Sequence, residues 1–194
     1  MPSRHEAWAL VTEYTTQPHL IRHMLAVEAA MMAYARRFGE DPELWGLVGL
    51  LHDFDYERYP NISLEGHPVI GSRILRERGY PEEVIRAILS HAPEVTGIRP
   101  ESRMERALVA VDELTGFLVA VALVRPTKSI LDVEVSSVKK KWKQKEFAAA
   151  VHRGEIEAAA AALGVPLDEH IRVVLDAMKE IANELGLERQ PVEA

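Results

Sequence analysis

Two side chains that can bind a metal ion stand next to each other in this sequence, at His52 and Asp53. Imidazole and carboxylate groups are ligands for Zn, Mn, Fe, Ni, Co or Mg, and consecutive ligands can reach one ion where a helix ends. The apolar run that precedes them, residues 44–51, predicts such a helix end. The pair alone is weak evidence, because a His-Asp dipeptide also occurs as a simple polar helix terminus.

Asp112 is a further candidate ligand because it lies in an apolar segment, residues 108–115, that predicts a buried helix. A buried carboxylate must be protonated, paired or bound to a cation, since an isolated buried charge is very costly. His23 faces partly inward on another expected helix, where it also fits as a hydrogen-bonded core residue. His67 and His91 stand at the start and the end of further expected helices, and each also fits a helix-terminal role.

The chemistry expected from such a centre is hydrolysis of a phosphoester bond. A cation held by histidines and carboxylates polarises a phosphoryl oxygen and lowers the pKa of bound water, which supplies hydroxide near neutral pH. Asp53 would act at the centre of this chemistry, and Asp55 or Glu57 would orient the water or act as the general base. Both acids also fit as solvated loop residues, and Asp55 is the better candidate because it is closer to Asp53.

Three basic residues are candidates for binding the phosphate groups of the substrate, namely Arg73, Arg125 and Lys128. Their charges would neutralise the phosphate oxygens that the metal leaves uncovered. The lysine-rich run of residues 139–145 could contribute in the same way, although such a run is more typical of a solvated helix face. The expected partner of the site is a small phosphorylated molecule.

Helical spacing of apolar residues extends over nearly the whole chain and predicts an all-α fold. Capping boxes mark two helix starts, at Ser3-x-x-Glu6 and at Ser102-x-x-Glu105, and Gly39 marks a helix end. The expected helices cover about residues 3–14, 18–38, 41–52, 67–78, 81–91, 103–124, 147–163 and 171–185. The irregular stretch after the His-Asp pair is a loop at a rigid helix end, a place that often carries function.

The composition is that of an ordinary globular protein, with 47% hydrophobic and 27% charged residues among 194. The absence of cysteine excludes disulfides, thiolate zinc sites and cysteine nucleophiles. We expect a metal-binding helical domain over residues 1–125 and a C-terminal helical extension over residues 126–194 packed on it. The longest apolar stretch is too short for a membrane span and the N-terminus lacks a signal-peptide pattern, so the expected location is cytoplasmic. The net charge of −7 disfavours extended nucleic acids as partners.

The order of the candidate ligands resembles the HD-domain superfamily of metal-dependent phosphohydrolases, in particular its HDIG-like branch. The resemblance covers about residues 20–125 and includes the stretches Gly49-Leu-Leu-His-Asp-Phe-Asp-Tyr56 and Gly66-His-Pro-Val-Ile-Gly71. It implies an all-helical fold and one or two divalent metal ions per chain. It also implies two ligand groups that share one aspartate: His23, His52, Asp53 and Asp112 for the first ion, and His67, His91 and the bridging Asp53 for the second.

The sequence departs from the family pattern at two places. Phe54-Asp55-Tyr56 stands where many HD domains have Ile-Gly-Lys, and His91-Ala92 stands where cyclic-dinucleotide phosphodiesterases have paired histidines. The resemblance therefore implies cleavage of a phosphoester of a nucleotide or a small phosphorylated metabolite, rather than that specific activity.

Two other functions are compatible with the same residues. The resemblance extends to di-iron oxygenases, which hold two irons with nearly the same ligands. A non-catalytic nucleotide-binding HD module is the third alternative, although its usual mark, the loss of a ligand, is missing. We also expect a homodimer formed through apolar faces of the C-terminal helices.

Overall fold

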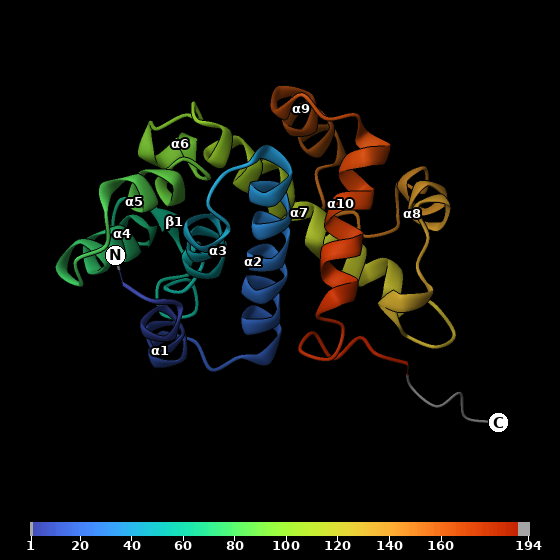
Figure 1. The fold of residues 1–194 in the computed structure, drawn as a ribbon, viewed down its shortest axis with the longest axis horizontal. Helices are drawn as coiled ribbons and strands as arrows, with labels where there is room; N and C mark the ends of the chain where they lie inside the picture. The colour runs from blue at the N-terminus through green and yellow to red at the C-terminus, as the bar shows by residue number, and fades with distance from the viewer. Residues whose placement is uncertain (1, 190–194) are drawn as a thin grey trace.

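Helices form nearly all the regular structure in the computed structural model, which describes residues 2–189 (Figure 1). The all-α fold expected from the sequence is confirmed. Two short strands, β1 (Ile62–Ser63) and β2 (His67–Pro68), pair in parallel. Within the described part of the chain, no helix is both long and apolar enough to cross a membrane. The helices are α1 (Arg4–Tyr14), α2 (Pro18–Phe38), α3 (Pro42–Leu51), α4 (Val69–Glu77), α5 (Glu82–Leu89), α6 (Pro93–Thr96), α7 (Arg103–Leu123), the 3-10 turn η1 (Ile130–Asp132), α8 (Val135–Trp142), α9 (Arg153–Leu163) and α10 (Leu167–Glu180).

The long helices α2 and α7 form the centre of the molecule. In Figure 1, α1 and α3 to α6 lie on one side of α2, and α8, α9 and α10 lie on the other. Both central helices contact α10, and α7 also contacts α9. Their inner faces are apolar, and Met31 and Leu114 are completely buried. The helices that carry His23 and Asp112 are therefore held by packing from both sides.

Local signals set the ends of several helices. The Ser3 and Ser102 hydroxyls accept hydrogen bonds from the backbone N–H groups of Glu6 and Glu105, at 3.3 and 3.2 Å. In return, each glutamate side chain accepts a hydrogen bond from the backbone N–H of its serine, at 2.7 and 3.0 Å. Gly39 ends α2 with a φ of 70°, a conformation that glycine adopts without steric cost.

α2 and α3 are joined by a short turn and lie very close together at Gly49. A Cβ atom on Gly49 would lie 2.8 Å from the Glu28 Cα and 2.8 Å from the Val27 carbonyl oxygen. These are backbone atoms, so a larger residue would force the two helices apart. His52 follows Gly49 by less than one turn, and this close contact therefore sets the position of His52 relative to α2.

Several segments differ from the expectations drawn from the sequence. The closing helix expected over residues 171–185 covers Leu167–Glu180, and α6 and α8 lie outside the expected helix ranges. The helix expected over residues 67–78 begins only at Val69, because residues 67–68 pair with β1. The helix expected over residues 147–163 begins at Arg153. The Arg153 guanidinium donates hydrogen bonds to the backbone carbonyls of Gln144 and Phe147, and these contacts hold the preceding residues in turns.

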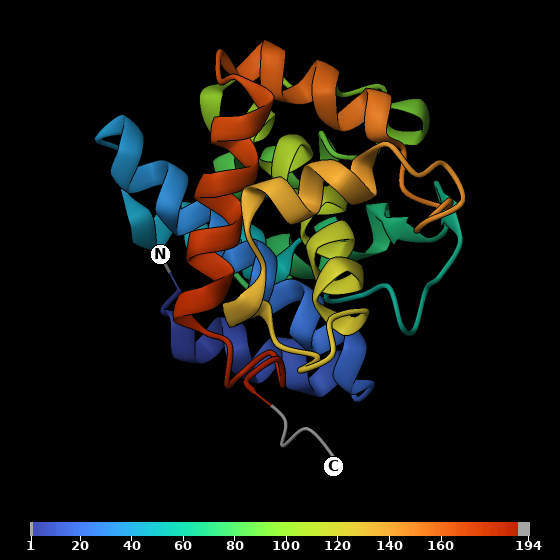
Figure 2. The ribbon, with the colours of Figure 1, turned by 90° about the vertical axis from the view of Figure 1, so that its right-hand side faces the viewer.

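A buried polar contact ties α10 to both central helices. Burial lowers the pKa of His170, so the ring is neutral. Its Nε2 donates to the Ala110 carbonyl at 2.7 Å, and its Nδ1 accepts from the Tyr34 hydroxyl at 2.5 Å. Figure 2 shows α10 beside α8 on the same side of the molecule. The division of the chain at residue 125 into two domains stays a prediction.

Candidate metal centre

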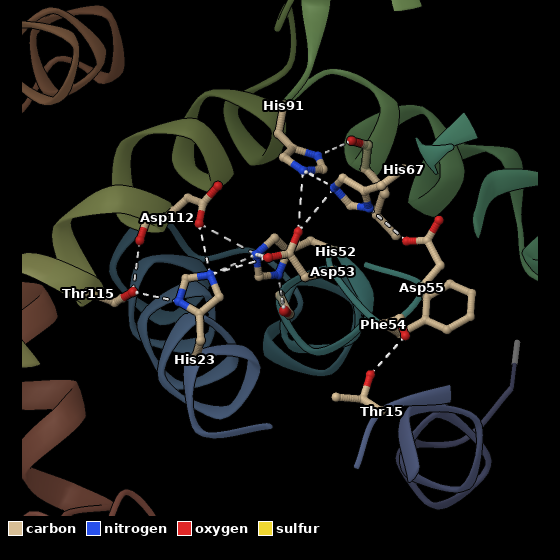
Figure 3. A network of polar contacts seen from close by, with 12 residues as sticks. Thr15, His23, His52, Asp53, Phe54, Asp55, His67, His91, Asp112 and Thr115 are labelled. Atoms are coloured by element: carbon tan, nitrogen blue, oxygen red, sulfur yellow. Dashed lines mark hydrogen bonds and ion pairs between the residues drawn. The ribbon is translucent and has the colours of Figure 1, made fainter. Parts of the chain in front are cut away.

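Six predicted residues lie together at the place where α2, α7 and the ends of α3 and α5 come close to one another (Figure 3). They form two groups of three, and within each group the potential ligand atoms all lie within 4.8 Å of one another. His23 lies on α2 and Asp112 on α7, whereas the others follow α3, form part of β2, or follow α5. The groups are His23, His52 and Asp112, and Asp53, His67 and His91.

The first group places three ligand atoms around one point. The Nε2 atoms of His23 and His52 are 3.2 Å apart. Asp112 Oδ1 lies 3.0 Å from the Nε2 of His23 and 3.5 Å from that of His52. The three ligand atoms come from α2, from the end of α3 and from α7, so the packing of these helices brings them together.

Asp53 joins the two groups. Its Oδ1 lies 3.2 Å from His67 Nε2 and 3.6 Å from His91 Nε2. Its Oδ2 lies 3.6 Å from His23 Nε2 and 3.4 Å from His52 Nε2. One carboxylate therefore presents one oxygen to each pair of histidines, which is the arrangement of a bridging ligand.

Hydrogen bonds at the far side of the rings fix the tautomer of three histidines. Nδ1 of His52 lies 2.7 Å from the Gly49 carbonyl, and Nδ1 of His91 contacts the Ile88 carbonyl. Nδ1 of His67 lies 2.7 Å from Asp55 Oδ1. Carbonyl and carboxylate oxygens only accept, so each Nδ1 carries the proton and donates it. The Nε2 atom of each neutral ring then directs its lone pair toward the centre.

His23 has the same orientation through Thr115. The Thr115 hydroxyl donates to the Asp112 carbonyl at 2.8 Å, and its oxygen lies 3.3 Å from His23 Nδ1. Since its own hydrogen is used, this oxygen accepts a hydrogen bond from Nδ1. All four imidazoles thus have an acceptor on Nδ1 and a free lone pair on Nε2, as metal-binding histidines require.

The spacing of the Nε2 atoms fits a cation between them. With the proton on Nδ1 in each ring, the Nε2 atoms of His23 and His52, 3.2 Å apart, direct two lone pairs at one point, and those of His67 and His91, 3.1 Å apart, do the same. Metal to nitrogen bonds of about 2.0–2.1 Å, at angles between octahedral and tetrahedral, separate two nitrogens by about 2.8–3.4 Å. The side chains present therefore suit two divalent ions.

Without a metal, protons take the place of the cation. Burial lowers the pKa of His67, but its hydrogen bonds to Asp53 and Asp55 outweigh this and raise the pKa to about 9. Burial also opposes protonation of His52, yet the carboxylates of Asp53 and Asp112 raise its pKa well above the usual value. Burial raises the pKa of Asp112, but the His52 and His23 imidazoles outweigh this effect and hold the pKa well below its usual value. The site is therefore built to hold positive charge.

The centre is open to solvent on one side only. The side chains of His52 and His67 are 0% and 3% exposed, whereas those of His23 and Asp112 are 24% and 25% exposed. Asp53 lies between these values, at 18%. A ligand can therefore reach the bridging carboxylate from the side of α2 and α7.

Asp55 and Glu57 occupy different surroundings. Asp55 is 1% exposed, and its Oδ2 accepts a hydrogen bond from the Gly71 N–H at 2.7 Å. A Cβ atom on Gly71 would lie 2.6–2.8 Å from the Asp55 carboxyl atoms, so only glycine permits this contact. Glu57 points toward the start of α2, where it accepts from the backbone N–H groups of Thr16 and Gln17 at 2.7 and 3.0 Å.

The predicted phosphate-binding residues do not lie together at the centre. Arg73 is exposed on α4. Arg125 follows the end of α7, thirteen residues after Asp112 and so about 20 Å farther along the helix axis. Lys128 is exposed in the loop beyond it, with a φ of 49°.

Sequence reasoning missed the groups that orient the imidazoles. Thr115 lies one turn after Asp112, on the same face of α7. His52 and His91 lie one and two residues after the last residue of a helix. The Nδ1 of each donates to the backbone carbonyl three residues earlier. The last carbonyls of a helix have no backbone partner, so a histidine just after a helix end is a usable sequence signal.

Comparisons with known proteins agree with this arrangement. A family model of the HD domain matches residues 20–116. Ribonuclease Y of Cutibacterium acnes is 31% identical over 87 residues, which cover 44% of this chain and 16% of that protein. Ribonuclease Y of Lawsonia intracellularis is 28% identical over 167 residues, which cover 86% of this chain and 28% of that protein.

The uncharacterized protein MJ0778 of Methanocaldococcus jannaschii is 34% identical over 101 residues, which cover 50% of this chain and 57% of that protein. The chain thus spans between 16% and 57% of the length of these three relatives. No solved structure matches significantly.

Proposed function

Because this chain belongs to the HD-domain family, we propose that it hydrolyses phosphoester bonds with two divalent metal ions held by the six residues described above. The observation that carries the proposal is the convergence of four Nε2 lone pairs on the carboxylates of Asp53 and Asp112. His23, His52 and Asp112 would hold one ion, and His67 and His91 the other. Asp53 would contact both.

When bound, a pair of divalent cations polarises a phosphoryl oxygen and supplies hydroxide near neutral pH. The residues of this chain contribute position and charge. The buried rings of His52 and His67 form the closed floor of the centre, and the exposed edge at His23 and Asp112 admits the substrate phosphate. Both oxygens of Asp55 are occupied by His67 and Gly71, so we assign it the role of orienting His67 rather than that of a general base.

The first substrates to test are phosphodiesters of nucleotides and short oligoribonucleotides. Two of the relatives are named Ribonuclease Y, and one of them aligns with 86% of this chain. The net charge of −7 favours small substrates over long nucleic acids. Phosphomonoesters of small metabolites form the comparison set, because a two-metal centre serves both bond types.

The test combines metal content with hydrolysis. We expect one or two ions of Mn, Ni, Zn, Co, Mg or Fe per chain by elemental analysis, and metal-dependent cleavage of bis(p-nitrophenyl) phosphate. Asp53→Asn should abolish both, because the amide cannot bridge two cations as a carboxylate does. Asp176→Asn is the matched control, since Asp176 is an exposed aspartate on α10 outside the groups that could hold a metal ion. A folded Asp53→Asn protein with full metal content and activity would refute the proposal.

A di-iron oxygenase is the second candidate, because four histidines and two carboxylates also suit iron. Two irons per chain with oxygen consumption, and no phosphoester cleavage with any metal, would select it. The cytoplasmic location and the homodimer stay predictions.

A further inference from the structure

A cavity of about 250 Å³ lies between the end of α7 and α8. Its apolar wall comes from the last turns of α7 and from Pro126. Its polar lining carries three positive charges, a hydroxyl and a carboxamide: Arg125, Lys140, Lys141, Ser137 and Gln144.

The cations of this cavity are not neutralised by carboxylates. Within residues 2–189, no ion pair joins Arg125, Lys140 or Lys141 to an acidic side chain. Arg125 Nε is buried and lacks a hydrogen-bond partner in the same part of the chain, whereas Nη1 of the same guanidinium donates to Ser137 Oγ at 3.5 Å. Lys139, which lies next to Lys140 in sequence, is paired with Asp168 at 2.7 Å.

This arrangement runs against the composition of the chain, which has 30 acidic and 23 basic residues. Hydrogen bonds from the Thr127 hydroxyl at 2.6 Å and from Arg189 at 3.0 Å lower the pKa of Asp132, and the charge of Arg125 lowers it further, so other partners already occupy this carboxylate. A partly buried guanidinium with an unpaired N–H is costly unless an anion completes it. The lining of the cavity therefore offers cationic donors that suit an anion.

The cavity is separate from the metal centre. Val121, Val124 and Arg125 follow Asp112 by nine to thirteen residues, about 14–20 Å along the axis of α7. At about 100° per residue, they lie on the opposite face of the helix from Asp112. A phosphate bound at the metal centre cannot occupy both places.

We propose that this cavity binds the phosphoryl group of a small molecule, as a second anion site independent of the proposed hydrolysis. The guanidinium fork and the two ammonium groups match the oxygens of a phosphate. The Gln144 oxygen accepts from Lys141 Nζ at 3.1 Å, which leaves its amide nitrogen and the Ser137 hydroxyl as neutral donors, and the apolar wall contacts the carbon part of the ligand.

The test uses the full chain, freed of metal by a chelator, in calorimetric titrations with inorganic phosphate at constant ionic strength. We expect saturable binding of one phosphate per chain. Arg125→Gln should weaken it at least tenfold, and Lys140→Gln, at an exposed position, about threefold to tenfold. Lys139→Gln should leave the affinity unchanged, because that lysine is already paired outside the cavity.

Asp53→Asn should also leave phosphate affinity unchanged, which separates this site from the metal centre. Circular dichroism checks that Arg125→Gln folds, and Lys140→Gln serves if it does not. Absence of saturation in the wild type would overturn the proposal. Equal affinity in the wild type and in Lys140→Gln would overturn it as well.

Discussion

Asp55 gives one of the four imidazoles a charged acceptor, whereas the other three bind neutral oxygens. His23 and His52 face the carboxylate of Asp112 as well as one oxygen of Asp53. The Nε2 atoms of His67 and His91 face only the other oxygen of Asp53. Asp55 therefore adds negative charge to the second group through the His67 ring. A carboxylate behind a histidine makes that ring a stronger metal ligand.

Asp55→Asn should weaken the second metal ion selectively. The amide keeps the shape and can still accept from Gly71, but the charge behind His67 is lost. We expect affinity for the second ion to fall about 10–100-fold and that for the first to change less. Chelator competition, followed by counting of metal per chain, measures both. Loss of both ions together, with Asp176→Asn unaffected, would contradict this role.

Metal affinity should depend on pH through His67. The ordinary histidine pKa of 6.5 rises to about 9 in the metal-free fold. Below pH 9 the bound proton must leave before metal binds, so affinity should increase about tenfold per pH unit toward pH 9 and then level off. The same proton stabilises the metal-free fold fully below pH 6.5, and this contribution is lost as the pH rises through about 9. Calorimetry in buffers of different ionisation enthalpy counts the released proton. A metal affinity that does not change between pH 7 and pH 9 would exclude this linkage.

At the scale of elements, the packing of α2 against α3 brings His23 and His52 together. His23 lies one turn before Val27 on α2, and His52 lies three residues after Gly49, directly after the end of α3. The contact of Gly49 with the α2 backbone therefore controls the 3.2 Å separation of the two Nε2 atoms.

Gly49→Ala should push the two helices apart. Overpacking against backbone costs about 1–3 kcal/mol of stability, and the displaced His52 should weaken the first ion. Gly46→Ala is the matched control, because its new Cβ would meet flexible side chains rather than backbone, Met32 at 2.9 Å and Glu28 at 3.7 Å. Urea denaturation and metal counts compare the two variants. A Gly49→Ala protein as stable and as metal-rich as Gly46→Ala would rule out this control of the site.

The elements differ in how far the sequence predicts them. Helix starts at Ser3 and Ser102 follow from residues three positions apart, so the sequence alone specifies them. The turns before Arg153 depend on its guanidinium, and the β2 pairing depends on β1, so periodicity could not reveal either. The six candidate ligands lie together as the family resemblance implied, and their role as ligands stays a prediction. Asp55 shows the limit, because only the fold reveals that His67 and Gly71 occupy its carboxylate.

For the whole molecule, the proposed ions connect segments that are far apart in sequence, from His23 to Asp112. A ligand that binds only the folded state stabilises it by about 2.7 kcal/mol at a hundred times its Kd. For a chain of this size, this corresponds to a rise in Tm of roughly 5–11 °C. Thermal denaturation with and without metal measures the shift, and Asp53→Asn should remove it. An equal shift in that variant would mean that the metal binds elsewhere.

The contact between His170, Tyr34 and Ala110 joins the segment that matches the HD-domain family to a helix outside that segment. The matched segment, residues 20–116, stops inside α7 and leaves out α10. A fragment cut at those borders would leave the Tyr34 hydroxyl and the apolar side of α2 without their cover. In this chain, the apolar back of the HD-domain segment is therefore closed by a helix that lies outside the matched residues.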